Sequence, residues 1–387
     1  MRKAYNLIVV GAGSAGSAAV QAAHDATILL VHGESGTPYR RDELSRTLFS
    51  DSAPSPGLDP VWLQQHDIDF RNGVRATGIN AVDHTLTFAD GVTVGYDRLI
   101  LATGSNPVFP KVVRPHERGS FFVLRTLDDA RDIVRAAKKA KNVLIAGMGV
   151  LALELAQRFV GAGIHITLAG ATPQLMPRQL NARSAEIIED VLVRSNVRLL
   201  FQEEILSFDE NNHHSWNVQM LKHHSQYDMV VFCVGVSAET ELAKIAGLNL
   251  RRGILVDESL RTSNEHIFAA GDCAELPDGT TGFVWNQAAH QGEVAGRNAT
   301  GGDSRVRSVP FPLTTSIFGQ TIASIGVPRF ADAFHVQETE DGSRYYALFI
   351  SESRVTGGIV INDERRAGIL VDAVQNSRSL EDVQNQL

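Results

Sequence analysis

The sequence has few cysteines, and their placement excludes two kinds of site. Only two occur among the 387 residues, Cys233 and Cys273, each within an apolar or glycine-bounded segment. Two cysteines so far apart in the chain indicate neither a disulfide framework nor a thiolate metal site. We interpret both as buried packing residues, and no metal site is expected.

Long apolar runs and an excess of positive charge are also lacking. No apolar stretch is long enough to span a bilayer, and the N-terminus leads into a short apolar strand without a cleavable leader. Lys and Arg total 36 against 44 Asp and Glu, a net charge of -8, which does not favour a nucleic-acid binder. We therefore expect a cytoplasmic protein with neither membrane nor nucleic-acid partners.

A glycine-rich segment near the N-terminus carries the first nucleotide-binding pattern. Residues 7–10 are a continuous apolar run typical of a buried parallel strand, and the glycines that follow lead into a helix-favouring segment and a second strand at residues 26–31. The glycines permit a tight turn, close approach of a pyrophosphate and close helix packing, and an acid after the second strand binds ribose hydroxyls. The predicted contacts are Gly11, Gly13, Ser14, Ala15, Gly16 and Glu34.

The same order of strand, glycine loop, helix and strand returns at residues 142–168 and predicts a second nucleotide site. Ala152 replaces the third glycine. By strand register we match Gly170 to Glu34, so this site has no carboxylate that discriminates against a 2′-phosphate. Arg178 is the nearest basic residue, and the choice between NADH and NADPH stays open. The expected contacts are Gly147, Gly149, Val150, Leu151 and Gly170.

The pattern of apolar residues changes near the C-terminus. From Val309 onward, short alternating runs and a closing helix indicate a separate α+β segment.

Two histidine pairs lie in polar sequence around Trp216, and we interpret them as part of a surface hairpin without an acidic partner for a metal site. The pairs are His213, His214, His223 and His224. Helices are predicted at residues 127–140, 182–194 and 288–298, and strands at residues 254–257, 266–270, 345–350 and 356–361.

Residues 262–274, which contain Gly271 and Asp272, make a family resemblance specific. Together with the two glycine loops, they resemble the FAD-dependent pyridine nucleotide-disulfide oxidoreductase superfamily over nearly the whole chain. The resemblance implies that the Gly-Asp pair caps a helix and that the aspartate hydrogen-bonds the flavin ribityl chain. It also implies that Glu154 lies near the nicotinamide and the flavin. Further implied contacts of FAD or the coenzyme are Val74, Ala102, Thr103, Gly104, Arg125 and Gly235.

Residues 39–46 indicate the branch of the family. Disulfide reductases of this superfamily carry two cysteines there and single-cysteine oxidases carry one, whereas this stretch has none. Neither a thiol relay nor a sulfenic acid intermediate can operate without that sulfur. The stretch is similar to the pattern of rubredoxin and ferredoxin reductases, which places Arg41 beside the isoalloxazine. Ser45, Trp285 and Gln287 are implied as further flavin contacts.

These patterns predict an α/β protein with two Rossmann-like dinucleotide-binding domains and a small α+β C-terminal domain. The expected FAD-binding domain is discontinuous, with residues 1–109 and 243–308. It encloses an NAD(P)-binding domain at residues 110–242, and residues 309–387 form the C-terminal domain. The oligomeric state is not predicted.

The resemblance implies an FAD-dependent NAD(P)H oxidoreductase. Hydride passes from NADH or NADPH to the flavin, which hands single electrons to a small carrier protein such as rubredoxin or a ferredoxin. Because this chain has no cysteine set for an iron-sulfur centre, the acceptor must be separate. Two alternatives stay open: an NAD(P)H oxidase or diaphorase that uses oxygen or a quinone, and a flavin-binding subunit of a larger redox complex.

An acidic carrier requires a basic docking surface. The candidate docking residues are Arg40, Arg41 and Arg46 at the flavin end, and Arg305 and Arg307 before the last domain. For the last two, solvated loop arginines are the alternative interpretation.

Overall fold

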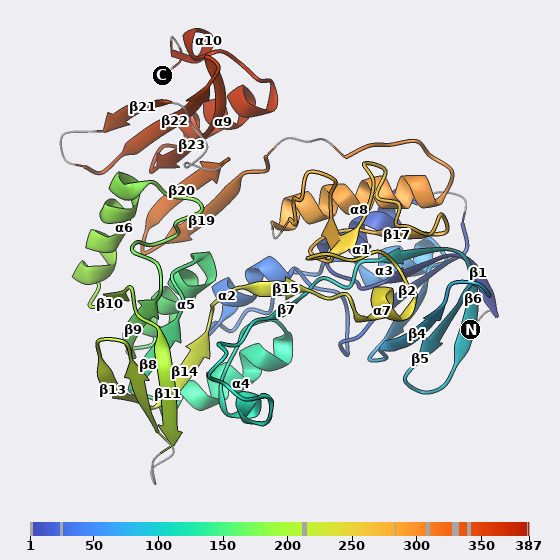
Figure 1. Ribbon diagram of the computed structural model, residues 1–387, viewed down its shortest axis with the longest axis horizontal. Coiled ribbons are helices and arrows are strands. Elements are labelled where there is room, and N and C mark those ends of the chain that lie inside the picture. The colour runs from blue at the N-terminus through green and yellow to red at the C-terminus, as the bar shows by residue number, and fades with distance from the viewer. Residues whose placement is uncertain are drawn as a thin grey trace. The chain divides into compact units, whose positions relative to one another are not determined.

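A computed structural model describes residues 3–23, 26–210, 215–282, 284–306, 310–326, 333–338, 342–384 and 386. The chain divides into two compact units, each built from discontinuous segments (Figure 1). Their segments are Met1–Thr47, Asp51–Asn106 and Val236–Arg307 in the first unit, and Leu48–Ser50, Pro107–Gly235 and Ser308–Leu387 in the second. The expected NAD(P)-binding and C-terminal segments thus lie in one unit, and their division into two domains stays a prediction.

A seven-stranded sheet forms the core of the first unit. Its strands run in the order β3-β2-β1-β6-β5-β4, with β17 also paired to β6. β1 pairs in parallel with β2 and β6, and β4, β5 and β6 pair antiparallel. The apolar run of β1 is fully buried because both faces of the sheet are covered. The bounds are β1 Ala4–Val10, β2 Ile28–His32, β3 Asp69–Asn72, β4 Ala76–Asn80, β5 Thr85–Phe88, β6 Thr93–Leu101 and β17 Ile267–Ala269.

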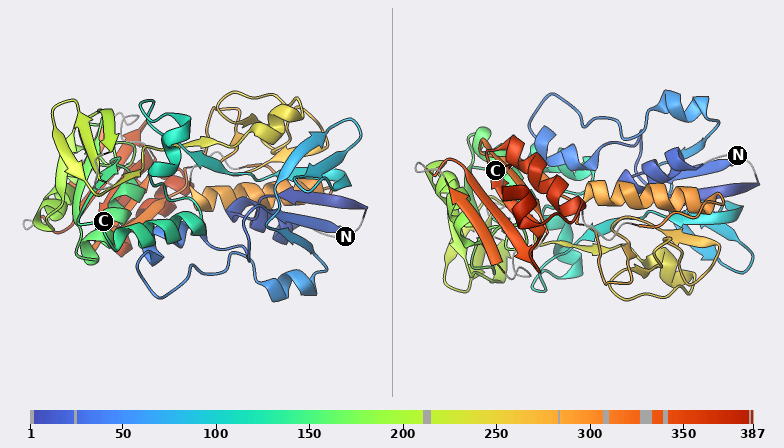
Figure 2. Two further views of the ribbon diagram at one scale, coloured as in Figure 1. Left: turned by 90° about the horizontal axis from the view of Figure 1, so that it is seen from below. Right: turned by 90° about the horizontal axis from the view of Figure 1, so that it is seen from above.

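Two helices far apart in the chain pack closely in this unit (Figures 1 and 2). They are α1 (Ser14–Ala22) and α8 (Trp285–Ala299). Side chains at Gly292 and Gly296 of α8 would overlap backbone carbonyl groups of α1, so both glycines are needed for this approach. The other elements are η1 Arg41–Glu43, α2 Leu44–Thr47, α3 Pro60–Gln65, β7 Ser105–Pro107, β15 Val236–Ala238, α7 Glu241–Ile245, β16 Ile254–Leu255 and β18 Ala274–Glu275.

The second unit contains the repeated nucleotide-binding fold. Its parallel sheet has the order β10-β9-β8-β14. A three-stranded antiparallel sheet, β11-β12-β13, lies between β10 and β14 in the chain. The helix predicted at residues 182–194 has those bounds because Asn181 caps its first turn, accepting a hydrogen bond from the N–H of Ser184 at 3.0 Å. The elements are η2 Pro115–Ser120, α4 Leu127–Ala137, β8 Asn142–Ala146, α5 Val150–Gly161, β9 His165–Gly170, α6 Ala182–Arg194, β10 Arg198–Phe201, β11 Ile205–Glu210, β12 Trp216–Met220, β13 His224–Tyr227 and β14 Met229–Phe232.

The same unit ends in a five-stranded antiparallel sheet of order β19-β20-β23-β22-β21. One face packs against α9, where Leu370 and Val374 meet buried side chains of the strands, among them Tyr346 and Leu348. The elements are β19 Leu313–Ile317, β20 Gln320–Ile325, β21 Ala333–Glu338, β22 Tyr345–Ser351, β23 Arg354–Ile361, α9 Glu364–Gln375 and α10 Leu380–Gln384. The predicted α/β class with Rossmann-like folds is confirmed.

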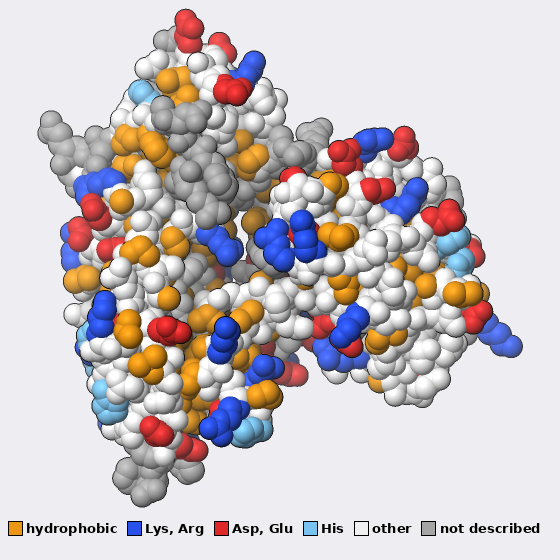
Figure 3. Space-filling view, in the orientation of Figure 1, with side chains coloured by type: hydrophobic (Ala, Val, Ile, Leu, Met, Phe, Trp, Pro, Cys, Tyr) orange, Lys and Arg blue, Asp and Glu red, His pale blue; other side chains and the backbone are white. Residues whose placement is uncertain are grey.

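The surface carries charges of both signs. On the face shown in Figure 3, both lysine and arginine and aspartate and glutamate side chains occur, and several basic side chains lie together near its middle. None of the helices in the described parts of the chain is both long and apolar enough to cross a membrane. The expected cellular location stays a prediction.

Candidate functional site

The first glycine loop connects β1 to α1 and leaves an open cradle. Gly11 has a φ of +108°, and a side chain there would overlap the backbone carbonyl of Ala102. A side chain at Gly16 would overlap the carbonyl of Gly11. At Gly13, by contrast, a Cβ would meet nothing within 4 Å, so the loop N–H groups and the start of α1 border open space. This arrangement fits a dinucleotide pyrophosphate, as the sequence predicts.

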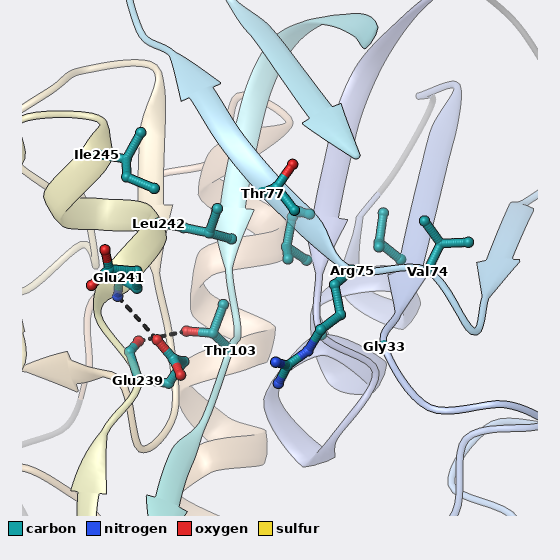
Figure 4. A pocket seen from close by; sticks show the side chains of 13 residues that line it. Gly33, Val74, Arg75, Thr77, Thr103, Glu239, Glu241, Leu242 and Ile245 are labelled. Carbon is teal, nitrogen blue, oxygen red and sulfur yellow. Dashed lines mark hydrogen bonds between the residues drawn. The ribbon is translucent and has the colours of Figure 1, made fainter. Parts of the chain in front are cut away.

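A pocket of about 430 Å³ adjoins this loop, a volume within the range of ligand sites. Figure 4 shows Arg75 reaching into the pocket from the side of Gly33 and Val74, with Glu239 and Glu241 opposite. Sequence reasoning named three of the lining residues, Gly11, Val74 and Thr103. It missed the charged ones, because Arg75 before β4, Glu239 after β15 and Glu241 at the start of α7 stand in no motif. The lining residues are Val10, Gly11, Val31, Gly33, Val74, Arg75, Ala76, Thr77, Thr103, Glu239, Glu241, Leu242 and Ile245.

Glu34, the predicted ribose acid, is held in place by two donors. Its carboxylate accepts hydrogen bonds from the Tyr39 hydroxyl and the Arg41 guanidinium, both at 2.7 Å. Burial alone raises its pKa, but Arg41 and Tyr39 lower it more, so the pKa lies below its ordinary value. Arg41 therefore lies at the acid expected to bind the adenosine ribose, and its implied position beside the isoalloxazine stays a prediction.

A buried histidine next to this acid also fits a bound nucleotide. His32, the last residue of β2, is 4% exposed, and no partner for its Nε2 is found among the described residues. Burial lowers the pKa of His32 and keeps the ring neutral. A buried polar atom without a partner is unusual in a folded protein. Together with the open cradle at Gly13, it supports the fit of FAD to these residues.

Asp272 lies in a loop that two hydrogen bonds fix. The Ser105 hydroxyl donates to its carboxylate at 2.7 Å, and the N–H of Gly271 donates to the side-chain oxygen of the buried Gln291 at 2.7 Å. Gly271 has a φ of +81°, a conformation that glycine adopts without strain. Sequence reasoning missed Ser105 and Gln291 because their partners lie 167 and 20 residues away in the chain.

The implied helix-capping role of the Gly-Asp pair is wrong. The segment after Asp272 enters the short strand β18, and α8 begins only at Trp285, with Val284 at its cap position. The hydroxyl of Ser105 orients the carboxylate of Asp272.

The start of α8 and the residues around α2 supply the other implied flavin contacts. Trp285 is 47% exposed, and the guanidinium of Arg40 lies 4.9 Å from its ring centre. Gln287 lies in the first turn of α8, and Ser45 is buried in α2. The remaining implied residues, Ala102 and Gly104, follow β6 next to the pocket. Their contacts with FAD stay predictions.

The second glycine loop joins β8 to α5 in the second unit. Gly147 has a φ of +142°, and a side chain there would overlap the backbone carbonyl of Cys233. A Cβ at Gly149 would meet nothing within 4 Å, as at the equivalent glycine of the first loop. Val150 and Leu151 begin α5, and Ala152 is fully buried without a clash. The loop therefore offers a second cradle of the same kind.

Strand register corrects the match made for Gly170. Val10 pairs with Val31 in the first unit, and Ala146 pairs with Ala169 in the second. Counting three residues on from Val31 gives Glu34, and the same count from Ala169 gives Thr172. The equivalent residue is thus Thr172, which carries no carboxylate either.

Gly170 has a packing role of its own. A Cβ there would lie 2.8 Å from Cγ of Met148, the middle residue of the second glycine loop. The methionine therefore covers the end of β9, and this cover favours glycine at position 170.

Three further predicted residues lie in the second unit. The backbone N–H of Arg125 donates to Asp129 at 2.9 Å, next to the capping box that starts α4. Glu154 lies in α5, and its carboxylate accepts a hydrogen bond from the Thr315 hydroxyl at 2.7 Å. Gly235 follows β14 with a φ of +116°. Their contacts with the coenzyme stay predictions.

The histidine hairpin differs from expectation in one respect. β12 and β13 form the hairpin, and His213 and His214 lie outside the described residues. Contrary to expectation, His223 has an acidic partner, because its Nδ1 lies 2.5 Å from the buried carboxylate of Glu203. Within the described ranges, no three His, Cys, Asp or Glu side chains group as metal ligands do.

Both cysteines are free thiols, one buried and one partly covered. Cys273 is fully buried and donates to the carbonyl of Leu101 at 3.2 Å. Burial raises the pKa of Cys233 to about 12. The packing role predicted for Cys273 agrees with this burial, whereas the side chain of Cys233 is only partly covered.

Two glycine cradles at the carboxyl ends of parallel strands define a two-nucleotide oxidoreductase fold. The chain belongs to the pyridine nucleotide-disulphide oxidoreductase family, whose model matches residues 5–292. It is accordingly an oxidoreductase that uses FAD and NAD(P)H.

Similar proteins include reductases of small electron carriers. The chain is 26% identical to NADH-rubredoxin oxidoreductase of Clostridium acetobutylicum over 390 residues, which cover 98% of this chain and 97% of that protein. It is 29% identical over 277 residues to the ferredoxin–NAD(+) reductase component of the biphenyl dioxygenase system of Paraburkholderia xenovorans. These residues cover 70% of this chain and 68% of that protein. The crystal structure of the Clostridium enzyme matches with a TM-score of 0.80 at 26% identity, covering 100% of both chains. These similarities confirm the predicted family and branch.

Proposed function

We propose that this chain transfers electrons from reduced nicotinamide, through FAD, to a separate small redox protein of the rubredoxin or ferredoxin type. The names of its relatives support this reaction. The observation that carries the proposal is the shielding of sulfur: residues 39–46 contain no cysteine, Cys273 is buried, and the pKa of Cys233 is raised to about 12. Thiolates are the form that relays electrons to a disulfide, so the proposal passes no electrons through Cys233 or Cys273.

Bound FAD supplies the conversion of a two-electron hydride into single electrons. The chain's residues bind and orient the two nucleotides. In the proposal, the first glycine loop holds the FAD pyrophosphate, and Glu34 accepts hydrogen bonds from the ribose hydroxyls. Asp272, directed by Ser105, holds the ribityl chain. Glu154 contacts the nicotinamide, as the family resemblance implies.

The test is an anaerobic titration of the flavin-loaded protein with NADH and, separately, NADPH. We expect at least one coenzyme to bleach the visible flavin absorption rapidly. Rapid turnover with rubredoxin or a ferredoxin, and slow turnover with oxygen, would then support the proposed acceptor. If oxygen or a quinone turns over as fast as any carrier, the oxidase or diaphorase alternative holds. If neither coenzyme bleaches the flavin, the remaining alternative holds: the chain is a flavin-binding subunit of a larger redox complex.

Of the arginines predicted to dock a carrier, Arg46 is exposed and is the one that we test; like the others it has a charged neighbour, since its charge helps to lower the pKa of Glu43. Arg40 pairs with Asp42 at 2.9 Å, Arg41 pairs with Glu34, and Arg305 pairs with the exposed Glu258 at 3.0 Å. Arg307 lies outside the described residues. Arg46 is exposed at the end of α2.

Arg46→Glu is expected to slow turnover with an acidic carrier by about tenfold at low salt, because charge steering sets the association rate. Reduction by NADH should not change. The matched control is Arg135→Glu on α4, where the arginine is 76% exposed. Steady-state rates from low to high ionic strength provide the measurement. Equal carrier turnover and equal salt dependence in Arg46→Glu and wild type would rule out docking there.

A further inference from the structure

An acidic side chain interrupts the apolar start of α5. Glu154 is the fifth residue of this helix, in the turn after the second glycine loop. Leu153 and Leu155 on either side are fully buried. Glu154 itself is partly buried, so a protein donor can fix the direction of its carboxylate.

The C-terminal sheet supplies such a donor. Thr315 lies in the middle of β19, is 5% exposed, and donates its hydroxyl to Oε1 of Glu154 at 2.7 Å. Just beyond the strand, the backbone N–H of Phe318 donates to Oε1 of Gln157 at 2.7 Å. Residues 154 and 157 are three apart and therefore lie on one face of the helix. The strand is thus attached to this face at two points.

The geometry of β19 explains why a threonine suits this position. Side chains along a strand alternate between its two faces, and Thr314 and Ser316 are exposed while Thr315 and Ile317 are buried. A β-branched side chain in a strand has restricted rotamers. The hydroxyl of Thr315 is therefore pointed at Glu154 by the backbone, with little freedom to turn away.

We propose that Thr315 is a positioning residue for Glu154, so that the C-terminal segment sets the direction of the acid at the second nucleotide site. The inference rests on the proposed function, in which Glu154 contacts the nicotinamide. It assigns to residues outside both glycine motifs a part in coenzyme oxidation. The hydrogen bond and the burial of the threonine carry it.

Four variants test the proposal in the flavin-loaded protein: Thr315→Val, Thr315→Ser, Glu154→Gln and the double variant Thr315→Val with Glu154→Gln. Valine keeps the shape and removes the hydroxyl, whereas serine keeps the hydroxyl. The matched control is Thr314→Val, on the exposed face of the same strand. Stopped-flow bleaching of the flavin by NADH and by NADPH gives the limiting rate and the coenzyme dissociation constant separately. Thermal unfolding and flavin content confirm that each variant is folded.

We expect Thr315→Val to lower the limiting rate about tenfold, the lower end of the effect of a hydrogen bond to a charged group. Thr315→Ser should restore most of the rate, and Thr314→Val should match wild type. In the double variant the two effects should not add, because Thr315 acts through the carboxylate that Glu154→Gln replaces. If Thr315→Val lowers the rate while its melting temperature stays close to that of wild type, the loss comes from positioning and not from general packing.

Three results would overturn the inference. If Glu154→Gln is slow but Thr315→Val matches Thr314→Val, Glu154 acts without the threonine. If Thr315→Ser is as slow as Thr315→Val, the hydroxyl is not the cause. If Glu154→Gln reduces the flavin at the wild-type rate, the role of Glu154 is wrong, while rapid bleaching of the wild-type protein still upholds electron transfer from the coenzyme.

Discussion

At the scale of single residues, the chain stabilises buried carboxylates with surrounding donors. Glu275 in β18 is fully buried and accepts hydrogen bonds from the side chain of Arg251 at 2.8 Å and from the N–H groups of Arg252 and Gly253 at 2.8 and 3.0 Å. Burial alone raises its pKa, but these donors lower the pKa from 4.5 to about 2. Because the folded-state pKa is the lower one, the charged carboxylate stabilises the fold fully above pH 4.5 and loses this effect as the pH falls toward 2.

Glu275→Gln is expected to lower the free energy of unfolding by about 3 kcal/mol at pH 7, because it leaves buried donors without their anion. Melting temperatures measured from pH 7 downward should show the gap to wild type shrinking below pH 4.5.

The control for this substitution is Glu265→Gln, whose carboxylate is 82% exposed. It should change stability by less than about 0.5 kcal/mol. A gap between Glu275→Gln and wild type that stays constant with pH would contradict the depressed pKa.

At the scale of elements, the glycines of the loop between the first strand and the first helix have different roles. A side chain at Gly16 meets the backbone of the loop itself, whereas one at Gly13 meets only open space. Gly16 is thus needed for the fold, and Gly13 is needed for the ligand.

Gly16→Ala should therefore destabilise the protein without FAD, while Gly13→Ala should leave that stability unchanged and weaken FAD binding by about tenfold or more, since its methyl group occupies the phosphate cradle. Thermal unfolding of the flavin-free variants and titration with FAD separate the two effects. Equal melting temperatures for the two flavin-free variants would show that the clash at Gly16 is relieved in solution.

Local signals predicted elements well, and contacts between distant segments were not predicted. The helix at residues 182–194 has its own cap, and both glycine loops carry a pattern with a physical cause at every position. In contrast, the partners of Asp272 and Glu154 come from Ser105 and Thr315, which stand in no motif. The match of Gly170 to Glu34 was wrong because the glycine loops define strand register only to within a few residues.

At the scale of the whole molecule, the proposed path of electrons uses no sulfur of this chain. The two thiols belong to different units and both are covered, Cys273 fully and Cys233 in part. A fold that its family shares with disulfide reductases is thus used here for electron transfer without a chain thiol.

A chromogenic thiol reagent should react slowly with the native protein at pH 8 and rapidly with two thiols after denaturation, because a thiol with a pKa near 12 has almost no thiolate at that pH. The variant Cys233→Ser should be reduced by the coenzyme at the wild-type rate. Fast labelling of the native protein, coupled with loss of flavin reduction in Cys233→Ser, would reinstate a sulfur route.

The close packing of α8 on α1 has a consequence for biosynthesis. The two helices belong to one unit but stand at opposite ends of its sequence, with residues 107–235 of the other unit between them. During translation the first glycine loop emerges early, and α8, which covers α1, begins 271 residues after the start of α1 (285 − 14). The nascent chain therefore completes the proposed FAD site only after the inserted nucleotide-binding sheet has left the ribosome, so we expect cofactor loading late in synthesis.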